Sequence, residues 1–347
     1  APEPDLSPPP APPPPAPPAP PPYFAPDQPP YHSPPSYDLP LPPPPKSGPA
    51  LLDSVFGLPH AQASALLLPS SPYSHLPSRS LRSFVVKAGD DVRLESLAML
   101  AIQHMHSLLA GVPAGPLLHP YAIACAGHGK GVVEVVEDAA SVDEVKKLSG
   151  IPSLPDFFER AFGQGGAERG NFLRSLVGYS LVSYVLQVKD RHNGNILLKR
   201  DGSICHIDFG FVFGDAPRMG KVPIFSERAP MKLTQEYWDV IGGWAGGGAE
   251  FCKLFEEGFE VCSAHKEEIA LIVEQGIKVI YSERGRQYSE LKAKKVGDGI
   301  RNRLTGGGPA GSPERREFIK NLIDFALNDW SSSNYDLLQK YMNGYAT

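Results

Sequence analysis

The stretch "VLQVKDRHNGNILLKRDGSICHIDFGFVFG", residues 185–214, combines two polar clusters with two β-prone runs. The first cluster comprises Asp190, Arg191, His192, Asn193 and Asn195. Asp208 ends the second apolar run, and the Asp201-Gly202 pair between the runs favours a two-residue type I′ hairpin turn. Such a turn predicts that Arg200 faces Ser203 and that Asn195 faces Asp208.

The polar groups at the open end of this hairpin are typical of phosphoryl transfer. A carboxylate beside an amide oxygen suits a hard cation such as Mg²⁺. Asp190 and His192 lie just upstream, where they can orient or deprotonate a hydroxyl group. Phosphoryl transfer also needs a cation on the phosphates. Lys87 ends the strand-like "SFVVK", and Glu95, eight residues further on in a predicted helix, is placed to hold this lysine in position. A lone lysine at a strand end, however, is usually only solvated.

The rest of the chain divides into three parts. Twenty-five of the 39 prolines fall in the first 49 of 347 residues, which predicts a disordered or polyproline tail over 1–60. Residues 61–138 are strand-rich, with one amphipathic helix after position 93. Residues 139–347 carry mainly helical patterns. We therefore expect an α+β fold in which a small lobe precedes a larger helical lobe, with a cleft between them.

Composition excludes some classes of function. A net charge of -5 gives no attraction of the whole chain to nucleic acid, and no nucleic-acid partner is expected. The four cysteines show no CxxC spacing, which argues against a zinc site or a disulfide framework and favours a reducing compartment. Neither a long apolar run nor a charged leader is present in the sequence, so we expect neither a membrane span nor a signal peptide.

Two features leave alternatives open. Between Lys278 and Arg303 there are eight Lys or Arg against three Asp or Glu, which fits either an anionic membrane surface or an ordinary solvated face. The Pro-rich tail is either a ligand for SH3 or WW type domains or a low-complexity spacer.

Several motifs together resemble the catalytic region of the phosphatidylinositol 3- and 4-kinase superfamily, and most closely the type III beta phosphatidylinositol 4-kinases. They are "SPYSHLP", "VVKAGDDVRLE", "GYSLVSYVLQVKDRHNGNILL", "HIDFGF" and "KLTQEYWDVIGG". The order Asp190-Arg191-His192 differs from the His-Arg-Asp of protein kinases. The resemblance implies a bilobal kinase-like fold and ATP- and Mg²⁺-dependent transfer to the 4-hydroxyl of phosphatidylinositol. It also implies a cytoplasmic enzyme, peripheral on an internal, Golgi-like membrane.

The resemblance also implies roles for individual residues. Those assigned to ATP are Ser71, Ser74, Lys87, Glu95, Glu134 and Val136. Those assigned to catalysis are Asp190 and His192, and those assigned to Mg²⁺ are Asn195 and Asp208. An activation loop over 210–234 would meet the inositol headgroup, with Arg218 and Lys232 as contacts.

The composition of that loop bears on the substrate. Its basic residues are Arg218, Lys221, Arg228 and Lys232, which are separated and mixed with acids. An already phosphorylated headgroup would need a denser cationic cluster, so the loop favours unphosphorylated phosphatidylinositol. Two alternatives remain at this point: a phosphatidylinositol 3-kinase, and a non-catalytic kinase-fold scaffold with a Pro-rich interaction tail.

Overall fold

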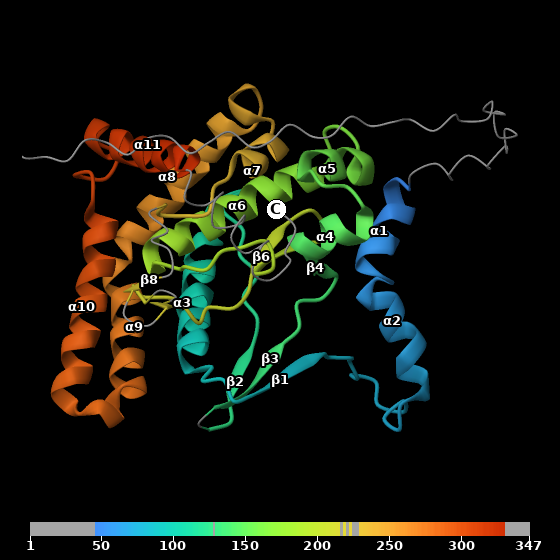
Figure 1. Cartoon of the computed structure of the whole chain (residues 1–347), viewed down its shortest axis with the longest axis horizontal. Helices are drawn as coiled ribbons and strands as arrows, with labels where there is room; N and C mark the ends of the chain where they lie inside the picture. Colours follow the sequence, from blue (N-terminus) through green and yellow to red (C-terminus); the bar gives the residue numbers. More distant parts are fainter. Residues whose placement is uncertain (1–45, 128, 216–217, 220–221, 224–228, 330–347) are drawn as a thin grey trace, which may run out of the picture. The chain divides into compact units, whose positions relative to one another are not determined.

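The computed structural model of the chain describes residues 46–127, 129–215, 218–219, 222–223 and 229–329 (Figure 1). The helices are α1 (Gly48–Phe56), α2 (His60–Leu67), α3 (Arg93–Leu109), α4 (Val142–Ser149), α5 (Leu154–Phe162), α6 (Ala167–Leu186), α7 (Gln235–Val240), α8 (Gly248–Ala264), α9 (Lys266–Ile280), α10 (Arg286–Thr305) and α11 (Pro313–Asn328). The strands are β1 (Phe84–Ala88), β2 (Ile123–Cys125), β3 (Lys130–Glu134), β4 (Ala139–Ser141), β5 (Ile196–Lys199), β6 (Ile204–His206), β7 (Arg218–Met219) and β8 (Val222–Pro223). The α+β class is confirmed.

Two antiparallel sheets carry the residues of interest. The first has the order β1-β3-β2 and the second the order β4-β5-β6, while β7 pairs only with β8. The chain passes from the first sheet to the second between Glu134 and Ala139. Figure 1 shows α3 between the first sheet and the helix pair α9 and α10, and α3 contacts both β2 and α9. The helix α3 therefore links the first sheet to the helical part of the molecule.

Helix α6 forms the centre of the helical part. Every residue from Ser175 to Leu186 is buried, because α8, α10 and strand β6 contact different sides of the helix. A helix buried all round shows no amphipathic stripe, as its sequence predicts. Its carboxyl end at Leu186 leads directly into the polar cluster of the catalytic stretch. None of the helices in the described part of the chain is both long enough and apolar enough to cross a membrane.

Helix α4 shows how local sequence fixes one of these elements. The Ser141 hydroxyl accepts the Glu144 backbone N–H at 3.2 Å, and the Glu144 carboxylate accepts the Ser141 N–H at 2.9 Å. This reciprocal pair is a capping box, which satisfies two donors at the helix start. Because Ser141 also ends β4, the cap fixes the turn from strand to helix.

The predicted boundary of the Pro-rich tail at residue 60 is wrong for its last part. Helix α1 occupies Gly48–Phe56, and its Leu51 and Val55 are buried where α1 contacts α4 and α5. Pro49 lies in the first turn, where a missing N–H costs nothing. A high proline content therefore did not prevent a helix at this position. Residues 1–45 lie outside the described part of the chain.

The predicted hairpin forms, but its turn and register differ from the prediction. Ile196 pairs with His206 and Leu198 with Ile204, while the Lys199 N–H donates to the Ser203 carbonyl at 2.8 Å. The loop therefore has three residues and ends at Gly202, whose φ of 82° is left-handed. Asn195 consequently lies opposite Ile207 rather than Asp208, since the Ile207 N–H donates to the Asn195 carbonyl at 3.0 Å.

Candidate active site

The loop between α6 and β5 is held in an unusual backbone conformation. Gln187 and Asp190 have φ values of 52° and 64°, and beyond β6 Asp208 and Phe213 have 59° and 60°. Non-glycine residues rarely adopt left-handed φ, and each costs of order 1 kcal/mol or more. Such residues persist where surrounding contacts fix them, and they concentrate at functional sites. Two of the four carry the carboxylates that the sequence assigns to chemistry.

Arg191 supplies much of that fixation. Its guanidinium, in a side chain that is 2% exposed, donates to the carbonyls of Lys189 at 3.0 Å and Ile207 at 2.7 Å, and also to the carbonyl of Asp208. The ring of Phe209 lies 5.4 Å from the guanidinium carbon. One buried cation, which we call the Arg191 clamp, thus joins the loop before β5 to the segment after β6. The sequence places Arg191 in the first polar cluster but does not predict this role for it.

Asp190 and His192 lie close together on this loop. The His192 Nε2 is 4.0 Å from the Asp190 Oδ1, and the two side chains are 8% and 16% exposed. The His192 Nδ1 accepts the Gly194 backbone N–H at 3.1 Å. In a neutral ring the hydrogen therefore resides on Nε2, which makes that atom a donor. Asp190 is the better placed of the two to accept a proton from a hydroxyl.

Asn195 and Asp208 fit the ligand set of a hard cation, although they are not cross-strand partners. The Asn195 Nδ2 donates to the Asp190 carbonyl at 3.0 Å, which leaves Oδ1 as the atom able to ligate metal. Asp208 is exposed, between the half-buried Ile207 and the buried Phe209, and its Oδ1 accepts the Gly210 N–H at 3.2 Å. The described residues hold no cluster of three His, Cys, Asp or Glu side chains suited to a metal. Two oxygen ligands suit Mg²⁺ when phosphate oxygens and water complete its shell.

Lys87 is paired as the sequence predicts. Its Nζ lies 3.0 Å from the Glu95 Oε2, and the Glu95 side chain is only 6% exposed. Burial acts to lower the pKa of Lys87, but the hydrogen bond and charge of Glu95 outweigh it. The negative charges of Asp208 and Asp90 add to the rise, so the pKa is above its ordinary value. Lys87 therefore stays charged at neutral pH. Its positive charge interacts with the negative charge of Asp208, the predicted metal ligand.

The residues predicted to hold adenine lie where β3 ends. A cavity of about 470 Å³ is lined by Glu134, Val136 and neighbouring residues. The Glu134 N–H donates to the Ala122 carbonyl at 2.8 Å, and its Oε2 accepts the Ala122 N–H at 2.9 Å. These bonds commit the Glu134 N–H and one carboxylate oxygen to Ala122, just before β2, so its carbonyl is the backbone group left for a base.

The hydrogen bonds of the two serines predicted to contact the ATP phosphates are local. The Ser71 hydroxyl accepts the Tyr73 N–H at 3.2 Å, and the Ser74 N–H donates to the Ser71 carbonyl at 2.9 Å. These bonds form a local turn after the short helix Leu68–Ser70. Within the described residues, no hydrogen bond or ion pair connects this turn to Lys87 or Asp208.

Of the two residues predicted to contact the headgroup, the structure describes the side chain of Lys232 but not that of Arg218. Lys232 is buried, at 6% exposed. Burial, followed by the positive charges of Arg191 and Lys232, holds the pKa of His206 well below its ordinary value. Arg191 and Lys232 thus both place positive charge near the buried ring of His206. Arg218 lies in β7, and its side chain falls outside the described part of the chain, as do Lys221 and Arg228.

Three further contacts at the site were missed. The Tyr237 hydroxyl donates to the Asn193 Oδ1 at 3.4 Å, and the Asp143 N–H donates to the Asn193 carbonyl at 3.2 Å. The ring of His206 stacks on Tyr179 at 4.5 Å. These contacts join α4, α6 and α7 to the catalytic stretch across long sequence separations. No local pattern predicts them.

Comparison with known proteins identifies the family of this chain. The profile of the family described as "Phosphatidylinositol 3- and 4-kinase" matches residues 82–279, and the chain belongs to this family. Phosphatidylinositol 4-kinase beta 2 of Arabidopsis thaliana is 36% identical over 298 residues, covering 79% of this chain and 24% of the relative. Phosphatidylinositol 4-kinase of Dictyostelium discoideum is 33% identical, covering 79% and 23%, and phosphatidylinositol 4-kinase beta of Callithrix jacchus is 34% identical, covering 79% and 33%. The chain thus spans about a quarter to a third of these relatives.

Proposed function

We propose that this chain is the catalytic region of an ATP-dependent phosphatidylinositol 4-kinase. The observation that carries the proposal is the arrangement of Lys87, Asp190, Asn195 and Asp208, in which one buried arginine joins the segments of the last three. The names of the relatives favour the 4-hydroxyl over the 3-hydroxyl as acceptor. We assign residues 61–138 to the amino-terminal lobe and 139–347 to the carboxyl-terminal lobe of the kinase.

We assign each of these residues a role that its contacts support. Lys87, fixed by Glu95, would hold the phosphates of ATP, and Asn195 and Asp208 would hold Mg²⁺. A bound Mg²⁺ neutralises charge that develops on the transferring phosphoryl group. Asp190 would accept the proton of the inositol hydroxyl as its oxygen attacks the γ-phosphorus and the bond to the β-phosphate oxygen breaks. His192 would donate from Nε2 to an acceptor oxygen, since its Nδ1 is engaged by Gly194.

The remaining assignments rest on the resemblance. Ser71 and Ser74 would cover the phosphates, while Glu134 and Val136 would offer backbone groups to adenine. Arg218 and Lys232 would meet the headgroup of phosphatidylinositol in a membrane surface. An SH3 or WW partner for the Pro-rich tail and a Golgi-like location remain predictions.

Transfer of labelled phosphate from ATP to phosphatidylinositol vesicles tests the proposal. We expect the purified chain to label the lipid in the presence of Mg²⁺ and Asp208→Ala to abolish labelling, because a metal ligand is lost. Asp239→Asn, an exposed carboxylate on α7, is the matched control and should keep full activity. Near wild-type turnover in Asp208→Ala would refute the metal assignment, and a folded but inactive wild-type chain would refute the function.

A further inference from the structure

A cavity of about 620 Å³ lies between α10 and the segment that follows Asp208. Its lining includes the cations Lys292, Lys295 and Arg303, against the single carboxylate of Asp215. None of the residues assigned above to ATP, Mg²⁺ or the acceptor hydroxyl lines it. A hollow with an excess of positive charge suits an anionic ligand.

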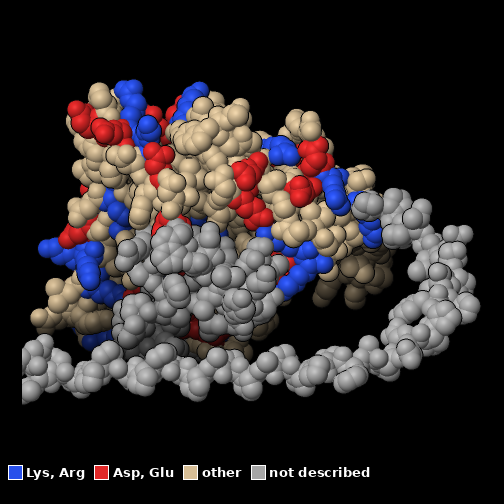
Figure 2. Space-filling model, turned by 45° about the horizontal axis from the view of Figure 1, so that its top comes forward, with Lys and Arg blue, Asp and Glu red and all other residues tan. Residues whose placement is uncertain are grey.

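One face of α10 forms the basic wall of the cavity. Tyr288, Lys292, Lys295, Gly299 and Arg303 follow one another at steps of three or four residues, which places them on the same side of the helix. A Cβ atom at Gly299 would lie 3.2 Å from the Arg303 Nη1. The glycine therefore leaves room for the guanidinium at the wall. In Figure 2 several Lys and Arg side chains gather at the left edge of the molecule, the side on which Figure 1 places α10.

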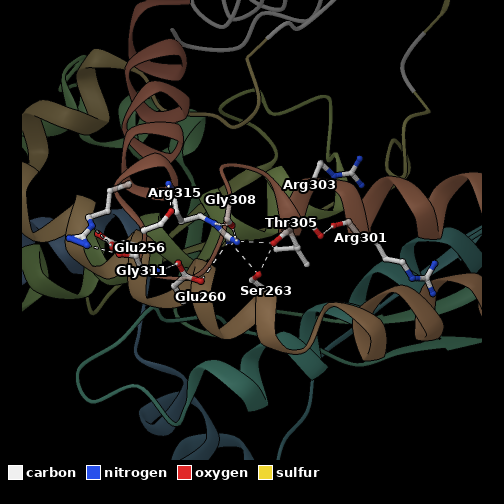
Figure 3. A network of polar contacts seen from close by, with 12 residues as sticks. Glu256, Glu260, Ser263, Arg301, Arg303, Thr305, Gly308, Gly311 and Arg315 are labelled. Carbon is white, nitrogen blue, oxygen red and sulfur yellow. Dashed lines mark hydrogen bonds and ion pairs between the residues drawn. The ribbon is translucent and has the colours of Figure 1, made fainter.

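Arg303 differs from its neighbour Arg301 in its partners. Arg301 pairs with Glu267 at 2.7 Å and with Glu274 at 2.5 Å. Arg303 donates to the Val185 carbonyl at 3.1 and 2.8 Å, and none of the carboxylates in the described ranges forms an ion pair with it. Figure 3 shows the two side chains leaving α10 in different directions. Burial lowers the pKa of Arg303 to about 10, as expected of a desolvated cation without a counter-ion.

The backbone that carries Arg303 is held by the surrounding polar network, part of which is drawn in Figure 3. The Ser263 hydroxyl and the Arg315 guanidinium both donate to the Leu304 carbonyl, at 2.6 and 3.4 Å. The Tyr184 hydroxyl donates to the Arg303 carbonyl at 3.2 Å. These bonds anchor the last turn of α10 to α8, α11 and the end of α6. The backbone beneath Arg303 is therefore held in place before any ligand binds.

The other two cations can turn to a ligand more easily. Lys292 lies 3.1 Å from an Asp215 oxygen, but the Asp215 side chain is 42% exposed, so water can replace the lysine. Lys295 is exposed and has no ion pair with any of the described residues. Tyr288 and Leu291 lie at the cavity rim and are 42% and 63% exposed. A basic cavity with an apolar rim is suited to a lipid headgroup at a bilayer surface.

We propose that this cavity binds the phosphomonoester group of a phosphorylated inositol headgroup. The choice of headgroup rests on the proposed function, because the product of a phosphatidylinositol kinase carries a phosphomonoester whereas its substrate has only a phosphodiester. A phosphomonoester brings close to two negative charges and three acceptor oxygens, which match the three cations. Bound phosphate would compete with Asp215 for Lys292. The enzyme would thereby bind its own product in a cavity lined in part by the start of the predicted activation loop.

Vesicle binding by the full chain, without ATP or Mg²⁺, tests this site. The vesicles are phosphatidylcholine carrying phosphatidylinositol 4-phosphate, phosphatidylinositol, or phosphatidylserine at matched total charge. We expect the first to bind most tightly. Lys295→Ala should weaken that binding about fivefold, since one basic residue near a bilayer contributes about 1 kcal/mol. Lys294→Ala removes the same charge one residue away, outside the cavity, and should have a smaller effect. Asp215→Asn should strengthen binding by releasing Lys292.

Each result decides the matter. Equal losses in Lys295→Ala and Lys294→Ala, or equal binding to phosphatidylserine vesicles, would overturn the site. Competition by soluble inositol 1,4-bisphosphate as strong as by the lipid would support the phosphomonoester and assign it to a soluble source. Wild-type lipid kinase activity is measured separately on phosphatidylinositol vesicles. Its absence would contradict the proposed function, while a lack of binding differences among the variants would contradict only this site.

Discussion

Two lysine–carboxylate pairs, Lys87 with Glu95 and Lys292 with Asp215, have nearly the same geometry but different surroundings. The nitrogen–oxygen distances are 3.0 and 3.1 Å, and the lysine side chains are 26% and 19% exposed. The carboxylates differ, because Glu95 is 6% exposed and Asp215 is 42% exposed. A buried carboxylate left without its cation pays a large desolvation cost, whereas an exposed one is solvated by water. The first pair therefore fixes its lysine, and the second can release it.

Removing the fixed lysine should give the largest effect. We expect Lys87→Met to lower kcat/KM for lipid phosphorylation by about 1000-fold, since a charged contact to the transferring group contributes about 4 kcal/mol in comparable sites. Steady-state kinetics on phosphatidylinositol vesicles measure this. Lys130→Met is the control, because Lys130 is an exposed residue that pairs with Ala88 in the same sheet. Similar losses in both variants would show that the effect belongs to the sheet rather than to Lys87.

Lowering the pH should destabilise the fold through buried histidines, while Lys87 and Lys292 keep their charge. The pKa values of both lysines are raised, so neither lysine loses its charge near neutral pH. His119, whose Nε2 lies 2.8 Å from the Ser203 hydroxyl, behaves differently: burial and the charge of Lys199 lower its pKa from 6.5 to about 4. The unfolded chain therefore binds a proton between pH 6.5 and 4 that the folded chain does not, and stability falls as the pH drops.

This loss should reach about 3 kcal/mol of unfolding free energy for His119 alone. Urea unfolding at a series of pH values measures it, and His119→Gln should flatten the slope over that range. Buried His206 should retain part of the slope, because its pKa is lowered as well. A slope identical in the wild type and His119→Gln would contradict the assignment.

Neutralising the buried carboxylate should have an intermediate effect. Glu95→Gln keeps the shape of the side chain but leaves Lys87 with a weaker partner, so we expect a loss of about 2 kcal/mol in unfolding free energy. The Michaelis constant for ATP should also rise, because Lys87 is no longer held in one position. Urea midpoints and ATP titrations measure the two effects. Unchanged values of both would mean that Glu95 does not position Lys87.

Removing the releasable lysine should have the smallest effect on stability. Lys292→Ala should change the unfolding free energy by less than about 1 kcal/mol, because its acidic partner remains solvated. The same urea experiment measures it beside Glu95→Gln. A loss equal to that of Glu95→Gln would remove the distinction between the two pairs.

The sequence predicted the pairs and elements that depend on neighbouring residues. Lys87 and Glu95, for example, are only eight positions apart and lie on adjacent elements. The prediction of the hairpin register was wrong because Asp201-Gly202 is compatible with both a two-residue and a three-residue loop. In the structure Gly202 ends a three-residue loop, which shifts the register. The predicted end of the Pro-rich tail was wrong because Leu51 is buried by helices about a hundred residues away in the sequence.

Contacts between distant segments also explain why the clamp and the basic cavity were not predicted. Arg191 reaches carbonyls on both sides of the hairpin, and its type alone does not distinguish a clamp from a substrate contact. The excess of basic residues between Lys278 and Arg303 was visible in the sequence, but not which of them line a cavity with Asp215. These placements depend on the packing of α10 against α6, which has no local signature.

The most direct test of the account is the ring position that the purified chain phosphorylates. Phosphatidylinositol vesicles are incubated with Mg²⁺ and labelled ATP, and the deacylated product is separated from standards of the 3-, 4- and 5-phosphates. The account predicts label at the 4-position alone, and none with Asp208→Ala. Label at the 3-position, or no labelled lipid from a folded chain, would contradict it.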